Sequence, residues 1–138
     1  SHSEYIQGID GQIYFLETSA RVGGAHIAEL VEYSTGVSLW AEWAKLECSA
    51  DPSKVKVKRT KKNHGTLMVT LAQQQHPDMS SYNAKEVAWK IDKPQHAGLI
   101  LVSPDYDRLT GLSDEYLKRF YEDFFMRLPA AESASQMG

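Results

Sequence analysis

Two β-rich runs joined by a glycine-bounded turn constrain the fold of this chain more than any other feature. Residues 4–7 and 12–17 are rich in isoleucine, tyrosine and phenylalanine, which favour strands. The four residues between the runs, Gly8-Ile9-Asp10-Gly11, have the composition of a turn. The sequence therefore predicts an antiparallel hairpin near the start of the chain.

A four-residue turn sets the predicted register of this hairpin. It would place Glu4 opposite Phe15, so that Glu4 and Glu17 lie diagonally across one face with their backbones roughly 7–8 Å apart. Because side chains alternate along a strand, Ser19 and Arg21 are expected on the same face as Glu17. One extra residue in the turn would change these faces.

The predicted acidic pair is a candidate cation site. Two carboxylates at that separation can both point onto a hard cation, and Mg²⁺ usually combines one or two protein carboxylates with water and substrate phosphates. The guanidinium of Arg21 is suited to a phosphoryl or carboxylate oxygen. From these residues alone, the competing interpretation is a solvated strand face with an ordinary Glu–Arg pair.

The rest of the chain predicts an α+β fold, an antiparallel sheet with packed helices. Helical periodicity and capping residues predict helices at 25–33 and 38–48 and helix starts at Ser103 and Ser113, and β-rich runs predict strands at 65–71, 86–91 and 97–102. A polar linker at residues 49–53 suggests a boundary between residues 1–50 and a second unit, residues 51–138. The tail after Pro129 is expected to fray.

Two apolar stripes mark the faces that the predicted helices should bury. The first consists of Leu39, Trp40, Trp43 and Leu46, and the second of Tyr116, Leu117, Phe120, Tyr121, Phe124 and Phe125. Tryptophans at this spacing are more often core residues than ligand contacts. We therefore expect the first stripe to lie in the core.

Composition and charge narrow the range of partners. The 138 residues carry a formal charge of −3, which gives no reason to expect nucleic acid or an anionic membrane as a partner. No apolar run approaches the roughly 20 residues of a membrane span. The single cysteine cannot form an internal disulfide, which fits a reducing cytoplasmic location. The basic segment Lys54–Lys62 is expected to be an exposed edge strand or loop, with an anion-binding patch as the alternative.

Residues 4–24 resemble the metal-binding hairpin of ATP-grasp enzymes, which include biotin carboxylase, glycinamide ribonucleotide transformylases and L-amino acid ligases. The segment reads Glu-Tyr-Ile-Gln-Gly-Ile-Asp-Gly-Gln-Ile-Tyr-Phe-Leu-Glu-Thr-Ser-Ala-Arg-Val-Gly-Gly. The family pattern is an acidic residue on one strand and Glu-x-Asn-x-Arg on the next. By position, the resemblance implies Glu4 and Glu17 as ligands of Mg²⁺ (or Mn²⁺). It also implies Ser19 as a cofactor-binding residue and Arg21 as a catalytic residue.

The resemblance extends downstream through the runs Gly23-Gly24-Ala25-His26-Ile27 and Thr35-Gly36-Val37, which are similar to the carboxylase and amino-acid-ligase branch. The chain departs from the usual pattern at Ser19, where asparagine is typical, although formate-dependent transformylases also have serine. His26 follows two glycines at a predicted helix start, where free N–H groups favour anions. It is a candidate substrate- or cofactor-binding residue, and the alternative is a histidine on the helix surface.

ATP-grasp enzymes hold ATP between two lobes and activate a carboxylate as an acyl phosphate, from which an amine or similar nucleophile displaces phosphate. The resemblance implies that this chain is the C-terminal part of such a ligase, with Mg²⁺ and ATP as cofactor and cosubstrate and a carboxylate as substrate. The nucleotide-binding lysines would lie upstream of the hairpin, so the chain alone is expected not to turn over. The alternative is a non-catalytic binding or dimerisation module, with a homodimer formed through the aromatic helix faces.

Overall fold

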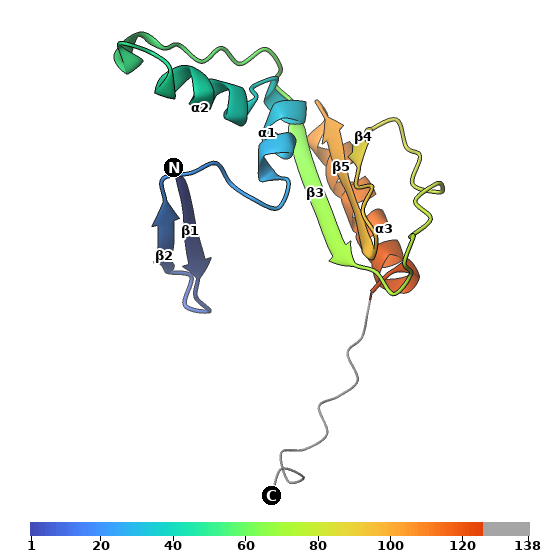
Figure 1. Ribbon diagram of the computed structural model, residues 1–138. Coiled ribbons are helices and arrows are strands. Elements are labelled where there is room, and N and C mark those ends of the chain that lie inside the picture. Colours follow the sequence, from blue (N-terminus) through green and yellow to red (C-terminus); the bar gives the residue numbers. More distant parts are fainter. Residues whose placement is uncertain (126–138) are drawn as a thin grey trace, which may run out of the picture.

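The computed structural model describes residues 1–125 as an α+β fold with two antiparallel sheets and three α-helices (Figure 1). In chain order the elements are β1 (His2–Gln7), β2 (Ile13–Ser19), α1 (Ile27–Thr35), α2 (Leu39–Glu47), a 3-10 turn (Pro52–Lys54), β3 (His64–Leu71), β4 (Val87–Lys90), β5 (His96–Ser103) and α3 (Tyr106–Asp123). The predicted α+β class is confirmed. The expectation for the tail after Pro129 lies outside the described residues.

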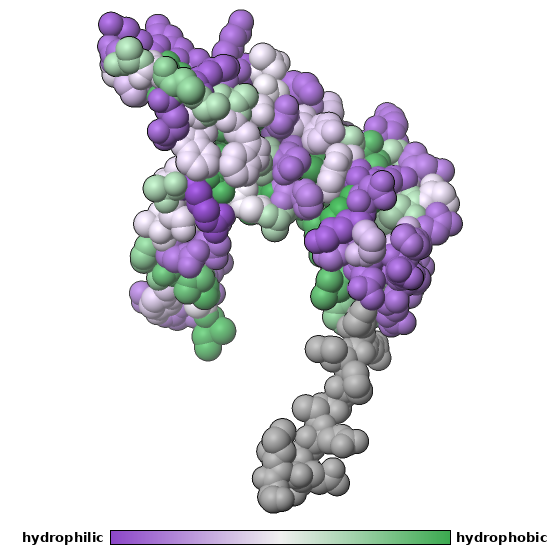
Figure 2. Space-filling view, viewed as in Figure 1, coloured by the Kyte–Doolittle hydropathy of each residue, from purple (hydrophilic) through white to green (hydrophobic). Residues whose placement is uncertain are grey.

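The hairpin β1–β2 forms its own sheet and projects as an arm beside the rest of the fold (Figure 1). Several large apolar side chains are exposed on it, and hydrophobic residues gather toward its lower part in the space-filling view (Figure 2). The exposed ones are Tyr5, Ile6, Ile9, Ile13, Tyr14, Phe15 and Leu16. The arm therefore has no buried core of its own, and a two-stranded hairpin in water is only marginally stable.

The second sheet has the order β3-β5-β4, so β5 is its central strand and is almost wholly buried. The helix α3 packs against this sheet and supplies much of the core. The helix α1 also contacts β3 and β5. It lies close against Gly65, where an added Cβ would come within 2.7 Å of Leu30 Cδ1, so a larger residue would displace α1.

Tyr82 anchors the long connection between β3 and β4 to α3. Its side chain is fully buried, and its ring makes edge-to-face contacts with Tyr116 and Phe120 at centroid distances of 5.0 Å. Its hydroxyl donates a 2.8 Å hydrogen bond to Asp123, and the guanidinium of Arg119 lies 4.3 Å from the ring centroid. Burial, together with the Asp123 carboxylate, raises the pKa of Tyr82 far above its ordinary value.

The final helix differs from the prediction of separate helix starts at Ser103 and Ser113, because α3 is continuous. Its N-cap is Asp105, whose side chain accepts a 3.0 Å hydrogen bond from the backbone N–H of Arg108. Ser113 lies inside the helix, where its hydroxyl donates to the carbonyl of Leu109 at 2.7 Å. A serine can either cap a helix or bond back to the preceding turn, and here it does the latter.

The predicted apolar stripes are only partly buried. On α3, the line Tyr116, Phe120 and Phe124 faces the core, whereas Leu117, Tyr121 and Phe125 are 49%, 59% and 42% exposed. The expectation of a buried α2 face is wrong, because α2 buries none of its residues and Trp40 is 53% exposed. The reason is that α2 packs mainly against α1 and stands away from the three-stranded sheet (Figure 1).

The basic segment at residues 54–62 is a loop rather than an edge strand. Its backbone closes the C-terminal end of α1, since the N–H groups of Thr60 and Lys61 both donate to the carbonyl of Thr35 at 3.0 Å. These bonds satisfy a helix carbonyl that would otherwise lack a partner. The positive charge of the segment also lies near the negative end of the helix dipole.

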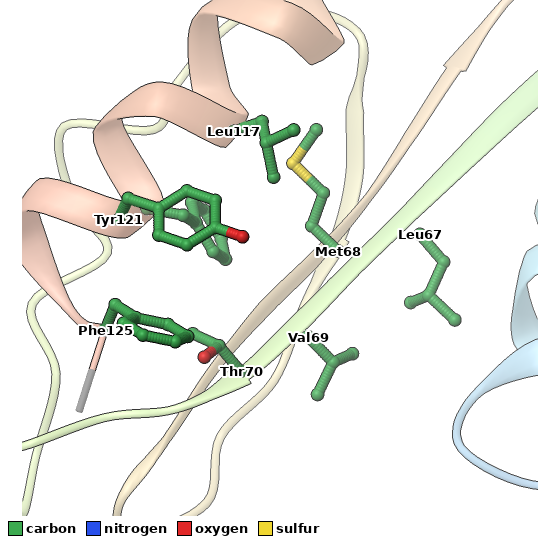
Figure 3. Close-up of a pocket in the computed structure, with 8 residues that line it drawn as sticks. Leu67, Met68, Val69, Thr70, Leu117, Tyr121 and Phe125 are labelled. Atoms are coloured by element: carbon green, nitrogen blue, oxygen red, sulfur yellow. The ribbon is translucent and has the colours of Figure 1, made fainter. Parts of the chain in front are cut away.

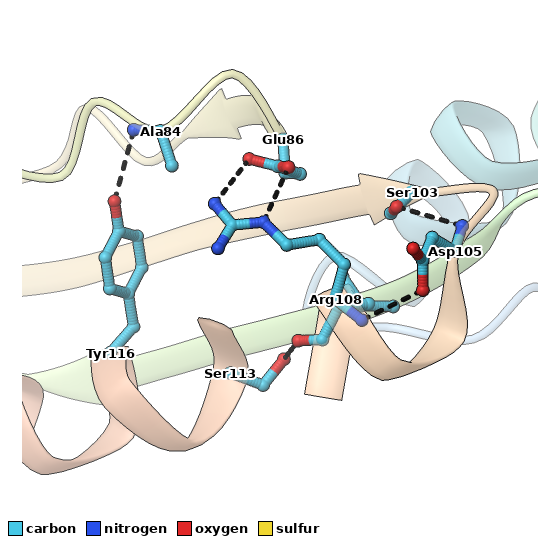
Figure 4. A network of polar contacts seen from close by, with 8 residues as sticks. Ala84, Glu86, Ser103, Asp105, Arg108, Ser113 and Tyr116 are labelled. Atoms are coloured by element: carbon cyan, nitrogen blue, oxygen red, sulfur yellow. Dashed lines mark hydrogen bonds and ion pairs between the residues drawn. The ribbon is translucent and has the colours of Figure 1, made fainter. Parts of the chain in front are cut away.

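An ion pair joins Glu86, the residue just before β4, to Arg108 of α3 (Figure 4), and only its glutamate is buried. Glu86 is only 6% exposed, and Arg108 donates to its two carboxylate oxygens at 3.0 and 3.3 Å. The hydrogen bonds from Arg108 hold the pKa of Glu86 below its ordinary value of 4.5. A carboxylate whose pKa is lowered on folding stabilises the folded state above its unfolded pKa. That contribution disappears as the pH falls through the folded pKa.

We expect Glu86→Gln to lower the thermal unfolding midpoint at neutral pH and to flatten the loss of stability below pH 4.5, because the variant lacks the group that titrates there. Circular dichroism melts from about pH 7 to about pH 3 would measure both effects. The control is Glu115→Gln, because Glu115 is exposed and forms a weak surface pair with Arg119, 3.8 Å away. Equal acid profiles for Glu86→Gln and the unmodified chain would contradict this role.

Candidate functional site

The two acidic residues of the hairpin lie directly opposite one another. Glu4 pairs with Glu17, whereas the next pair is Tyr5 with Phe15, which leaves Leu16 as a bulged residue without a partner. The predicted diagonal arrangement is therefore wrong, and the observed pairing brings Glu4 and Glu17 closer together than predicted. Residues directly opposite in an antiparallel pair share a face, with Cβ atoms about 4.5–5.5 Å apart. Both carboxylates therefore lie on one side of the arm.

The register differs from the prediction for two reasons: the turn is one residue longer than expected, and the bulge at Leu16 shifts the pairing of Glu4 by one residue more. The N–H of Gly8 donates to the carbonyl of Gln12 at 2.8 Å, and β2 begins at Ile13. Asp10 fixes this turn by accepting hydrogen bonds from the Gln12 N–H at 3.0 Å and from the Tyr14 hydroxyl at 2.9 Å. Both bonds lower the pKa of Asp10, and the bond from Gln12 has the larger effect. This carboxylate belongs to the turn and not to the acidic pair.

The face that carries the acidic pair also holds His2 and Ser19, which pair across the two strands. The imidazole Nε2 of His2 lies 3.0 Å from a carboxylate oxygen of Glu4, and both residues are half-buried. The predicted position of Ser19 beside Glu17 is therefore confirmed. His2 was missed by the sequence argument, although its spacing of two residues from Glu4 already places both on one face.

Arg21 lies beyond the end of β2, so strand alternation does not reach it. Its side chain is exposed, and its Nη1 donates to the carbonyl of Val22 at 3.2 Å. Arg21 and His2 nevertheless line one concavity of about 660 Å³ between the base of the hairpin and α2, with Trp43 on the opposite wall. Glu4 and Glu17 are not among the residues that line this concavity, so Arg21 is connected to the acidic pair only through His2, which contacts Glu4.

The base of the hairpin meets α1 at Gly23. A Cβ at this position would lie 3.1 Å from His2 Nδ1 and 3.1 Å from Ile27 Cγ2, tighter than ordinary van der Waals contact. Glycine therefore allows the first strand and the start of α1 to approach one another. This contact positions the arm relative to the helix.

His26 is the N-cap of α1 rather than a residue inside the helix, which corrects the predicted helix start. Its backbone is left-handed, with φ of 66°, and so is that of Ala25, with φ of 49°. Its ring packs on Trp89 of β4 at a centroid distance of 4.6 Å, and its Nδ1 lies 3.7 Å from Glu29. His26 thus contacts the three-stranded sheet, whereas the acidic pair lies on the two-stranded one.

The donor set of the hairpin fits a magnesium ion that is shared with a phosphorylated ligand. Within residues 1–125, no three His, Cys, Asp or Glu side chains gather as a complete metal site. Glu4 and Glu17 offer two facing carboxylates, and Mg²⁺ commonly takes one or two carboxylates and completes its shell with water and substrate phosphates. Two carboxylates are too few to enclose a cation, so an ion held here would take the rest of its ligands from outside the pair.

Comparison of the chain with protein-family models, with curated proteins and with solved structures gave no match. Across the described part of the chain, no helix is both long and apolar enough to cross a membrane. The hairpin, with its facing carboxylates, is therefore the part of the described chain that bears most directly on function.

Proposed function

We propose that this chain is the C-terminal part of an ATP-grasp ligase, which uses MgATP to activate a carboxylate as an acyl phosphate for attack by an amine or similar nucleophile. The observation that carries the proposal is the cross-strand pair of Glu4 and Glu17. By the sequence resemblance, both would stand at the positions that the ATP-grasp pattern assigns to metal ligands. Ser19 shares their face and stands at the position of the usual asparagine.

The residues of the arm have distinct roles in this proposal. Glu4 and Glu17 would hold Mg²⁺ (or Mn²⁺), which when bound neutralises phosphate charge and aligns the groups for transfer. Glu4 would then exchange its contact with His2 for one with the cation. The hydroxyl of Ser19 would donate to a phosphate oxygen, and Arg21 would neutralise the substrate carboxylate or the transferred phosphoryl group.

The exposed apolar surface of the arm supports the same proposal. Tyr5 and Phe15 are 59% and 61% exposed although their rings pack edge to face, 5.7 Å apart. Contiguous apolar surface of this kind usually marks a contact with another polypeptide. In an ATP-grasp enzyme the nucleotide lies between two lobes, so a nucleotide-binding lobe would cover the arm. His26 would contact substrate only if its ring left Trp89.

Calorimetric titration of MgATP tests this proposal. The titration would compare this chain with a longer chain that adds the region upstream of the hairpin in the parent protein. We expect binding by the longer chain alone, because the nucleotide-contacting lysines would come from the added lobe. Tight binding by this chain alone would contradict that division of the site. Binding by neither would contradict the ATP-grasp assignment and favour the non-catalytic interaction module.

A further inference from the structure

The two edges of the three-stranded sheet are built differently. The edge strand β4 is short, has a register shift between Val87 and Trp89, and carries Lys90. Shortness, irregularity and lysine are all features that prevent an edge from pairing with another molecule. The opposite edge, β3, has eight residues and a continuous register. It contains no proline and no Asp, Glu, Lys or Arg, so nothing in the strand blocks pairing.

The hydrogen bonds of the sheet show which groups of β3 face this open edge. The carbonyl of Gly98 accepts from the N–H of Ile91, so Gly98 directs its backbone toward β4. Its partner Val69 is then in a non-hydrogen-bonded pair and directs its own N–H and C=O away from β5. Alternation extends this outward orientation along the strand to Gly65, Leu67 and Leu71.

The sequence of β3 is nearly symmetric about Met68, reading Thr66-Leu67-Met68-Val69-Thr70. We propose that β3 pairs antiparallel with β3 of a second copy of this chain, with Met68 on the two-fold axis. Leu67 then lies opposite Val69 of the second copy, and Thr66 lies opposite Thr70. Threonine pairs and branched apolar pairs are favourable cross-strand neighbours.

This register agrees with the backbone. The residues whose N–H and C=O groups face the edge have odd numbers, and pairing centred on Met68 matches odd residues only with odd ones. Two kinds of hydrogen-bonded pair would form, Leu67 with Val69 and Gly65 with Leu71. In each, the two residues would exchange both backbone hydrogen bonds. The antiparallel direction also keeps His64 of one copy away from His64 of the other. The strand is thus complementary to itself in backbone and side chains, and it has no Asp, Glu, Lys or Arg that would oppose the pairing.

An apolar groove beside β3 extends the proposed contact (Figure 3). It measures about 280 Å³ and lies between Met68 and Thr70 of the strand and the exposed residues Leu117, Tyr121 and Phe125 of α3. A two-fold axis through Met68 places α3 of the second copy antiparallel on the same side of the joined sheet. The same side chains of both copies are then covered, which is the self-complementary geometry of a closed dimer.

Sedimentation equilibrium with Val69→Lys tests the pairing. Val69 is 43% exposed, so lysine can be accommodated in the monomer, but the two lysines of a dimer would lie close together across the axis. We expect the unmodified chain to dimerise and Val69→Lys to weaken the association at least about tenfold. The control is Ala88→Lys, which adds the same charge at the exposed opposite edge and should leave association unchanged. A monomeric unmodified chain, or equal association by all three proteins, would overturn the proposal.

Cysteine cross-linking tests the register even if Val69→Lys fails to fold. In a Cys48→Ser background, Met68→Cys should form an intermolecular disulfide under mild oxidation. The two copies of residue 68 would form a non-hydrogen-bonded pair, in which the Cα atoms are about 4.5 Å apart. The matched control Thr66→Cys should not cross-link, since the two copies of that residue would be roughly 13 Å apart along the strands. Equal cross-linking of both, or none of Met68→Cys with folding intact by circular dichroism, would overturn the register.

Discussion

Replacing Glu17 by glutamine is expected to lower the ATP-dependent turnover of the proposed ligase by about 100-fold or more, as the loss of one group that stabilises transferred charge commonly does. Glutamine keeps the shape of the side chain and removes its negative charge. The facing pair of Glu4 and Glu17 would then hold a divalent cation with a single carboxylate. Because Glu17 is exposed, the substitution should leave the fold intact.

The measurement is phosphate release at saturating and subsaturating MgATP, with a matched Glu32→Gln control. Glu32 is exposed on α1, so the control makes the same chemical change away from the arm. We also expect higher concentrations of Mg²⁺ or Mn²⁺ to recover part of the turnover of the Glu17 variant, because weakened metal binding responds to mass action. Unchanged turnover in the Glu17 variant would rule out the proposed metal site.

The largest effect on stability is expected at Tyr82, where replacement by alanine should reduce the free energy of unfolding by about 3–5 kcal/mol. The side chain is fully buried between Tyr116, Phe120 and Phe124, so its loss leaves a cavity. The milder Tyr82→Phe removes only the hydrogen bond to Asp123 and should cost about 1 kcal/mol. The difference between these two variants separates packing from hydrogen bonding.

Urea unfolding followed by tryptophan fluorescence would measure these free energies. Tyr106→Ala is a suitable control, because Tyr106 is 62% exposed at the start of α3 and its loss should cost less than about 1 kcal/mol. A Tyr82→Ala variant as stable as the Tyr106 control would show that the connection between β3 and β4 does not depend on this ring.

The sequence indicated the elements of the fold better than their details. The hairpin, the strand β5 and the glycine that ends α1 all follow from local patterns, and Gly36 has the left-handed conformation expected of such a residue. The bulge at Leu16 has no comparable signal. Both a four-residue and a five-residue turn fit the same glycines, and a slip of one residue changes which side chains oppose one another.

The burial of residues far apart in the sequence could not be predicted, because it depends on tertiary contacts. Tyr82 lies in an irregular connection, and only its tertiary contact with α3 buries it. The aromatic stripe of α3 predicted one apolar face, but whether Leu117 and Tyr121 are buried depends on what lies beside β3. Periodicity specifies the face of a helix and not the neighbour that covers it.

The close approach at Gly23 sets how near the arm can lie to α1. Since a methyl group there would lie 3.1 Å from both His2 and Ile27, alanine should move the hairpin and α1 apart by a few tenths of an ångström, and this shift would reach Glu4 through its contact with His2. The core around Tyr82 lies in the other sheet, so such a variant should melt like the unmodified chain. A change at Gly23 would then misalign the acidic pair while the rest of the molecule stays folded. The position of the hairpin relative to α1 could therefore be varied independently of folding.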